Sequence, residues 1–233
     1  MRKELKSPQP YGLKHFKYSS HYWILKFLSE ERRPLKILDV GAADGYLGAI
    51  LKEQGHYVVG IERDAALAAT ARNHYACFEV VDIESFDFPY SQEFDCVLFA
   101  DVLEHLRDPA TVLKRVLPCL KTGAQVIVSV PTVANIVIRA SLFLGRFEYG
   151  DRGILDRTHL RFFSLKSLKT LLNRCGFDVR KIYATPIPVQ MILPVTNRQF
   201  FAPLHGLHHL VVRLWKTLFA YQFVIKADLR SAH

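Results

Sequence analysis

A glycine-bearing turn after a short apolar run is the part of the sequence best suited to holding a ligand. The turn reads DVGAADG from Asp39 to Gly45. Gly41 allows a sharp change of direction, while Ala43 and Gly45 leave little side chain between the backbone and a ligand. Glu62 closes the next apolar run about 23 residues after Asp39. A carboxylate in that position can accept hydrogen bonds from both hydroxyls of a ribose.

The turn does not match a dinucleotide-binding turn, which would read G-x-G-x-x-G. Those positions hold Gly41, Ala43 and Tyr46, and the tyrosine stands where close helix packing needs a small residue. Asp39 and Asp44 would also repel a pyrophosphate. A cofactor with a ribose, no phosphate and a positive centre fits these acids better. S-adenosylmethionine has these properties.

Two of the ten histidines could serve as the base that a hydroxyl nucleophile requires. His105, in LEHLRDP, and His159, in DRTHLRFF, each follow a predicted strand, so we expect both to line the acceptor pocket. The alternatives are that His105 caps or packs a helix, and that DRTH is a structural turn in which Asp156 and Arg157 pair. Arg157 or Arg161 could instead bind an anionic group of the substrate.

Apolar runs and helix-like segments alternate along the chain, which predicts the elements that position these residues. Strands are expected at 35–40, 56–62, 77–83, 94–101, 124–131, 178–185 and 220–229, and helices at 19–33, 45–55, 64–75, 108–123 and 164–176. The pattern predicts an α/β fold, a doubly wound, Rossmann-like, seven-stranded sheet with helices on both faces. The sheet should be mostly parallel, with a last antiparallel strand.

Residues 1–33 are expected to form an N-terminal arm and helix that could close over the cofactor as a lid. Residues 34–233 are expected to form one domain with insertions at 132–163 and 186–219. Four cysteines lack a C-x-x-C pair, no apolar run is long enough to span a membrane, and the start of the chain is unlike a signal peptide. These features favour a cytoplasmic location.

Four segments of the chain together resemble the class I S-adenosylmethionine-dependent methyltransferases. They read ILDVGAADGYLG, GIERD, VVDIESFDFP and FDCVLFADVLEHLRDP. The resemblance covers roughly residues 35–185 and is closest to the small-molecule group whose fourth strand ends in an E-H-L-type turn. The later LDRTHLRFFSLKSLKTLLNRCGF is also similar to a segment common in that group. The family usually has glycine where this chain has Ala43.

The resemblance implies a role for each residue that matches the family pattern. The methionine part of S-adenosylmethionine would lie against Asp39, Gly41, Ala43 and Gly45. The ribose hydroxyls would bind Glu62, with Arg63 beside the adenine. The adenine would contact Asp82 and Ile83, although Asp82 could instead cap a turn. Ala100, Asp101 and Val102 would pass under the cofactor.

The implied activity is methyl transfer to a small-molecule acceptor, with an oxygen of a sugar, quinone-like or lipid-linked compound as the expected target. The net charge of +9 suggests nucleic acid as an alternative substrate. That alternative is disfavoured because no N/D-P-P-aromatic motif follows the fourth strand and no Pro-Cys pair lies there. A non-catalytic S-adenosylmethionine-binding module is the second alternative. No metal site and no oligomeric state are predicted.

Residues 203–219, PLHGLHHLVVRLWKTLF, predict an amphipathic helix. Its leucine and valine stripe could cover the acceptor pocket or touch a membrane surface, with basic side chains and Trp215 beside it. Peripheral contact at the inner membrane face would follow from the second option. The alternative is a helix packed on the core with its basic side in water.

Overall fold

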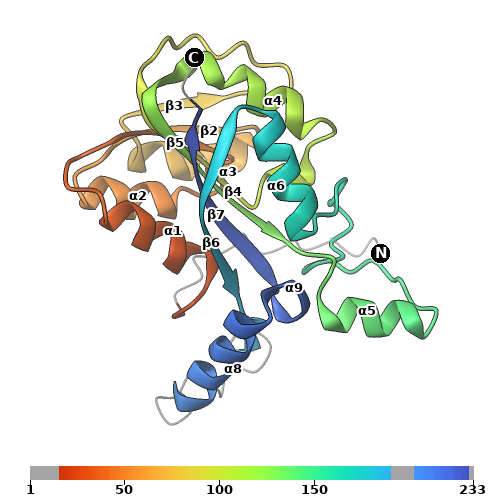
Figure 1. Ribbon diagram of the computed structural model, residues 1–233. Coiled ribbons are helices and arrows are strands. Elements are labelled where there is room, and N and C mark those ends of the chain that lie inside the picture. Colours follow the sequence, from red (N-terminus) through yellow and green to blue (C-terminus); the bar gives the residue numbers. More distant parts are fainter. Residues whose placement is uncertain (1–15, 190–201, 231–233) are drawn as a thin grey trace, which may run out of the picture.

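The computed structural model describes residues 16–189 and 202–230, which form one seven-stranded sheet in the order β3-β2-β1-β4-β5-β7-β6 (Figure 1). The strands are β1 (Lys36–Val40), β2 (Tyr57–Glu62), β3 (Cys77–Val80), β4 (Phe94–Ala100), β5 (Leu120–Pro131), β6 (Phe177–Thr185) and β7 (Gln222–Leu229). The pairs from β3 to β5 are parallel, and β7 is antiparallel to both of its neighbours. The predicted mostly parallel sheet with a last antiparallel strand is confirmed.

Several helices begin at a side chain that caps the helix start. They are α1 (Ser20–Ser29), α2 (Tyr46–Glu53), α3 (Ala65–Ala71), α4 (Pro109–Arg115), α5 (Ile136–Phe143), α6 (Leu165–Arg174), α8 (Ala202–Leu214) and α9 (Lys216–Phe219). Asp64 accepts two backbone amides at the start of α3, and Asp108 does the same for α4. Ser164 and Ser167 form a reciprocal capping box on α6.

Helices cover both faces of the sheet, as predicted, because the strands alternate their apolar side chains. In β4, Cys96 and Leu98 belong to a core with α1, α2 and α3, whereas Val97 and Phe99 belong to a core with α4 and α6. α1 places Trp23, Ile24, Phe27 and Leu28 in the first core. The N-terminal helix therefore packs on the sheet, while the arm at 1–15 lies outside the described residues and its lid role stays a prediction.

Several predicted boundaries were wrong, and two of them have a clear local cause. The helix expected over 108–123 ends at Arg115, and a 3₁₀ turn at Leu117–Cys119 leads into β5 from Leu120. Pro118 lacks the amide hydrogen needed to continue an α-helix, which explains the early end. The third strand stops at Val80 instead of residue 83, because the chain turns at Asp82, whose side chain accepts the Glu84 amide at 2.9 Å.

Two glycines make room for aromatic rings behind the first turn. A Cβ added to Gly48 would lie 2.2 Å from the Tyr75 ring, and one added to Gly60 would lie 2.6 Å from the Phe78 ring. Tyr75 consequently sits against α2 and β2, and its hydroxyl donates a hydrogen bond of 2.7 Å to Asp39. This packing connects the core to the carboxyl end of β1.

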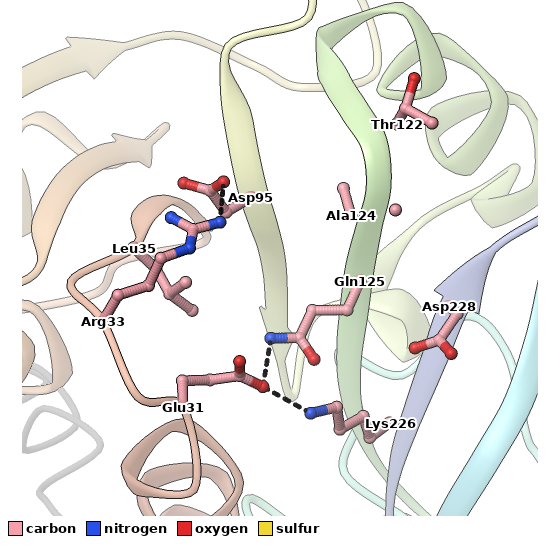
Figure 2. A pocket seen from close by; sticks show the side chains of 10 residues that line it. Glu31, Arg33, Leu35, Asp95, Thr122, Ala124, Gln125, Lys226 and Asp228 are labelled. Carbon is pink, nitrogen blue, oxygen red and sulfur yellow. Dashed lines mark hydrogen bonds and ion pairs between the residues drawn. The ribbon is translucent and has the colours of Figure 1, made fainter.

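A polar pocket at the amino edge of the sheet contains two groups of charges that pair within it. Figure 2 shows Arg33 bonded to Asp95, and Glu31 bonded to Lys226 and Gln125. Burial alone would raise the pKa of Asp95, but hydrogen bonds from Arg33, the Lys36 amide and Lys121 lower it to about 2. These pairs join the end of α1 to the sheet. The pocket lies at the edge opposite the glycine turn, where β1 begins instead of ending.

Candidate active site

The turn after β1 requires glycine at two positions. Gly41 has φ +78°, and an added Cβ would lie 2.5 Å from Val102 Cγ2. Gly45 has φ +89°, and its Cβ would lie 2.7 Å from the Cα of Ala71. Ala43 also takes a positive φ of 49°. For a residue with a Cβ this conformation costs about 1 kcal/mol, which is consistent with the usual glycine of the family.

Glu62 is half-buried at the end of β2 and faces this turn. Its Oε2 accepts the Ala43 amide at 3.0 Å, and its Oε1 accepts the Asp64 amide at 2.9 Å. These two bonds fix the carboxylate, and each oxygen keeps another lone pair for a ligand hydroxyl. The neighbouring Arg63 side chain is exposed.

Asp39 is a buried carboxyl group beneath the turn. Burial raises its pKa to about 6, the negative charge of Glu62 adds to the rise, and the hydrogen bond from Tyr75 opposes it. Burial also raises the pKa of Asp44, whose Oδ1 is buried without a hydrogen-bond partner in the described structure. The turn therefore fits a ligand that carries positive charge and hydroxyls, as S-adenosylmethionine does, and disfavours a diphosphate.

We expect Asp39→Asn to stabilise the ligand-free protein near neutral pH. The folded state holds the pKa of Asp39 at about 6, above the ordinary 3.8, so this group destabilises the fold increasingly as pH rises from 4 to 6. Two pKa units correspond to roughly 2–3 kcal/mol. Urea unfolding should show that gain at pH 8 and little difference at pH 4. The exposed Asp87→Asn serves as control. A gain of the same size at both pH values would contradict the assignment.

The third strand leads to Asp82 and Ile83. Asp82 is exposed and its carboxylate bonds the Glu84 amide, so it forms the turn cap considered as an alternative. Ile83 is buried in the core beside the site. The adenine contacts of both residues remain predictions.

Asp101 stands at the end of β4 in a strained backbone conformation, between Ala100 and Val102. Its φ is +58°, a left-handed region that residues other than glycine adopt uncommonly. Ser129 of β5 and Gln222 of β7 both donate side-chain hydrogen bonds to its Oδ1, the second at 3.1 Å. Three strands thus hold this carboxylate at the carboxyl edge of the sheet.

Three residues of this edge were missed from the sequence: Ser129, Gln222 and Tyr221. Burial, followed by the charges of Asp101 and Asp156, raises the pKa of Tyr221 to about 12. The available signal was that Ser129 and Gln222 are polar residues inside apolar strands. Such residues need buried partners, and partners often mark a site.

The structure brings His105 and His159 together. Their ring centroids lie 4.8 Å apart at an interplanar angle of 73°. The Nδ1 of His105 lies 3.2 Å from the Thr158 carbonyl oxygen, and the Nδ1 of His159 lies 3.0 Å from the Ile154 carbonyl oxygen. A carbonyl only accepts, so each Nδ1 carries the hydrogen and each neutral ring keeps a basic Nε2. Burial lowers the pKa of His105, with a further contribution from His159.

The histidine pair adjoins the glycine turn. The His105 amide donates to the Val102 carbonyl at 3.0 Å, and Val102 is the side chain that Gly41 must accommodate. One short segment therefore joins the ligand-binding turn to the two imidazoles. This proximity is what a transfer between a bound cofactor and a second substrate requires.

The expected pairing of Asp156 with Arg157 is not what the structure shows. Asp156 accepts the backbone amide and hydroxyl of Thr158 at 2.8 and 2.7 Å. Arg157 instead pairs with the exposed Asp151 at 3.3 Å. Arg161 donates to the Arg107 carbonyl oxygen. Segment 156–161 is thus a capped turn that fixes His159.

This sheet, with an antiparallel strand between β5 and β6 and an acid-lined turn after β1, defines a class I S-adenosylmethionine-dependent methyltransferase. Residues 16–182, most of the chain, match the family model described as a methyltransferase domain. The chain belongs to that family.

Curated relatives cover only part of this chain. It is 29% identical over 100 residues to the ubiquinone biosynthesis O-methyltransferase of Stutzerimonas stutzeri, covering 40% of this chain and 43% of that protein. The enzyme of the same name from Acinetobacter baylyi is 31% identical over 101 residues, covering 40% and 42%. The chain thus matches less than half the length of these relatives.

Solved structures agree over nearly the whole chain. An S-adenosylmethionine-dependent methyltransferase from Mesorhizobium loti has a TM-score of 0.61 at 18% identity, covering 90% of this chain and 98% of its own. The 1,6-didemethyltoxoflavin-N1-methyltransferase of Burkholderia thailandensis, solved with S-adenosylhomocysteine, has a TM-score of 0.57 at 19% identity, covering 91% and 77%. At these identities the likeness establishes the fold. Among the described residues, no helix is long and apolar enough to cross a membrane.

Proposed function

We propose that the protein transfers the methyl group of S-adenosylmethionine to an oxygen of a small quinone-like, sugar or lipid-linked acceptor. The observation that carries the proposal is the pair of adjacent imidazoles, His105 and His159, next to Val102, the residue that packs against Gly41 of the glycine turn. A hydroxyl nucleophile must lose a proton as it reacts, and a neutral Nε2 can accept it. The name of the curated relatives, O-methyltransferase, supports oxygen as the acceptor atom.

The protein's own residues bind and align the reactants. Asp39 and Glu62 would hold the positive methionine end and the ribose, while Asp82 and Ile83 would border the adenine. When bound, S-adenosylmethionine supplies an electrophilic methyl group. Asp101, whose carboxylate is held by Ser129 and Gln222, would lie between the cofactor and the acceptor. Such alignment provides much of the rate enhancement in an in-line displacement.

An exposed apolar surface lies on α5 and α8. It supports two parts of the proposal, a hydrophobic acceptor and contact of the protein with an anionic lipid surface. α5, α8 and α9 project together at one end of the molecule (Figure 1). α5 is fastened to α9, since Asn135 donates to the Ala220 carbonyl at 2.7 Å and Arg139 to the Thr217 carbonyl at 3.3 Å. Phe143 is 92% exposed and Leu214 is 78% exposed.

The predicted amphipathic helix over 203–219 is broken into α8 and α9 at Trp215, and its apolar stripe faces water. The exposed members are Leu204, Leu207, Val211 and Leu214. Val212 of α8 is nevertheless fully buried in the core, so the helix also packs on the sheet, as the alternative expected. Exposed leucines next to basic side chains such as Arg213 suit an anionic membrane surface.

The function is tested by transfer of labelled methyl from S-adenosylmethionine to catechol, quinol, sugar and RNA acceptors. We expect transfer to a hydroxyl acceptor, and we expect His159→Asn to lower kcat at least about 100-fold. Asparagine can still donate to the Ile154 carbonyl but has no nitrogen in place of Nε2. His74→Asn is the control. Transfer to RNA alone, or an unchanged kcat in His159→Asn, would contradict the proposal.

A further inference from the structure

We propose that Glu104, His105 and His159 form a binding site for a divalent transition-metal cation in the acceptor pocket. The proposal rests on the proposed function and deepens it, since the cation would bind the acceptor's hydroxyl oxygen. With the cation bound, both Nε2 atoms would be its ligands, and the cation would take over from a free imidazole the task of making the hydroxyl acidic. One ligand atom from each of the three side chains lies within 4.8 Å of the other two. Small movements would bring them to a common ion at the distances of about 2.0–2.2 Å that metals require. The proposal departs from the absence of a metal site expected from the sequence.

The carboxylate of the set is held in the protein interior. Glu104 is 1% exposed and lies in the 3₁₀ turn Leu103–His105 directly after β4. A buried carboxylate is costly unless it meets positive charge or hydrogen-bond donors, and a metal ion supplies that charge. Asp101 lies three residues before Glu104 in the chain, and the Asp156 carbonyl accepts the His159 amide at 3.0 Å, so both acids adjoin the set. The pocket therefore has an excess of acidic groups that attracts a cation.

Backbone hydrogen bonds fix the two ligand-bearing segments to each other. The Glu104 carbonyl accepts the Leu160 amide at 2.8 Å and the Arg161 amide at 3.0 Å. The His105 ring is bonded to the Thr158 carbonyl in the same facing segment. His159 therefore keeps its place opposite Glu104 and His105 although it lies far away in the sequence. Such a fixed set of ligands binds a metal without a large ordering cost.

Each histidine is oriented as a metal ligand usually is. Metal-binding imidazoles generally donate their second ring N–H to a carbonyl or carboxylate, which fixes the tautomer. His105 and His159 both donate from Nδ1 to backbone carbonyls, at 3.2 and 3.0 Å. Both Nε2 lone pairs are then available. A pair of simple packing histidines would not need the same tautomer in both rings.

The ligand set selects the kind of cation. Two imidazoles and one carboxylate suit Zn²⁺, Fe²⁺, Co²⁺ or Mn²⁺ better than Ca²⁺ or Mg²⁺, which prefer oxygen ligands. Three protein ligands leave positions open for a substrate oxygen. A cation there would lower the pKa of the acceptor hydroxyl, so its proton could pass to solvent before the oxygen takes the methyl group.

Binding of Co²⁺ to EDTA-treated, gel-filtered protein tests the site directly, by calorimetry and by visible absorption. We expect one equivalent bound, and we expect Glu104→Gln, His105→Asn and His159→Asn each to weaken binding at least about tenfold. The control is the double variant His205→Asn, His208→Asn on α8, the alternative imidazole source, which should bind Co²⁺ as the wild type does. Loss in that variant alone, or no loss in the three site variants, would overturn the proposal.

Affinity for S-adenosylhomocysteine, measured on the same samples, separates the two proposals. We expect the three site variants to keep the wild-type affinity for S-adenosylhomocysteine. Without metal, their melting temperatures should lie within a few degrees of the wild-type value. Loss of Co²⁺ binding in these variants would then not result from unfolding. Wild-type protein that binds S-adenosylhomocysteine and transfers methyl after EDTA treatment, with no Co²⁺ bound, would overturn the metal site alone. Co²⁺ binding without any methyl transfer would support the site and contradict the proposed function.

Discussion

Glu62→Ala is expected to weaken binding of S-adenosylhomocysteine at least about 30-fold, which corresponds to roughly 2 kcal/mol. The variant would remove the charged acceptor proposed for two ribose hydroxyls. It would also leave the Ala43 and Asp64 amides without the carboxylate that they now meet at 3.0 and 2.9 Å. The turn that holds the methionine end should therefore loosen as well. Isothermal calorimetry measures the change.

Glu62→Gln separates these two effects. Its amide oxygen can still accept one backbone amide, but it lacks the charge and the second acceptor oxygen. We expect a loss between the wild type and the alanine variant. Glu53→Ala, at the exposed end of α2, removes a carboxylate without touching the turn and should bind normally. Unchanged affinity in Glu62→Ala would show that the turn and β2 do not hold the cofactor.

The sheet and the turn after β1 could be predicted because their signals are local. Strands buried on both faces appear as continuous apolar runs, and the turn depends on glycines whose need is visible within seven residues. Gly41 and Gly45 indeed have positive φ and no room for a Cβ. The last antiparallel strand followed from the long connection before it.

The features that were not predicted from the sequence have two causes. Some depend on a single residue that ends an element, and others depend on contacts between residues far apart in the chain. Pro118 ends a helix that periodicity alone would have continued. Asp101 accepts side-chain hydrogen bonds from Ser129 and Gln222, which reach it only after β4, β5 and β7 lie side by side. Nothing local to β7 indicates that partner.

The histidines illustrate the same limit. Both were expected near the acceptor because each follows a strand, and parallel strands end at one edge of the sheet. Their contact, with rings 4.8 Å apart, depends on the capped turn at 156–161. Glu104 was not predicted as a site residue, because the local sequence LEHL does not indicate that its side chain is buried. A metal site was accordingly not expected from the sequence.

The exposed apolar surface leads to the second large effect, on membrane binding. We expect the wild-type protein to sediment with vesicles rich in phosphatidylglycerol at low salt, and to do so weakly with neutral phosphatidylcholine vesicles. Leucine and phenylalanine side chains each contribute about 1.5–3 kcal/mol when they leave water. Phe143→Ser combined with Leu214→Ser removes two of the most exposed ones, so the partition coefficient should fall at least about tenfold.

Charge and apolar contact can be distinguished on the same surface. Arg213→Glu with Trp215→Ala should also reduce binding, and more strongly at low than at high salt, because screening already weakens the basic side chains at high salt. Tyr57→Ser, which alters an exposed aromatic residue at the start of β2, is the matched control and should sediment as the wild type does. α5 and α8 lie at the end of the molecule toward which β5 runs (Figure 1). An acceptor dissolved in lipid could therefore reach the proposed site from the bound surface. If the wild-type protein does not sediment with anionic vesicles at low salt, this route is ruled out. The acceptor would then have to be a compound that reaches the site from aqueous solution.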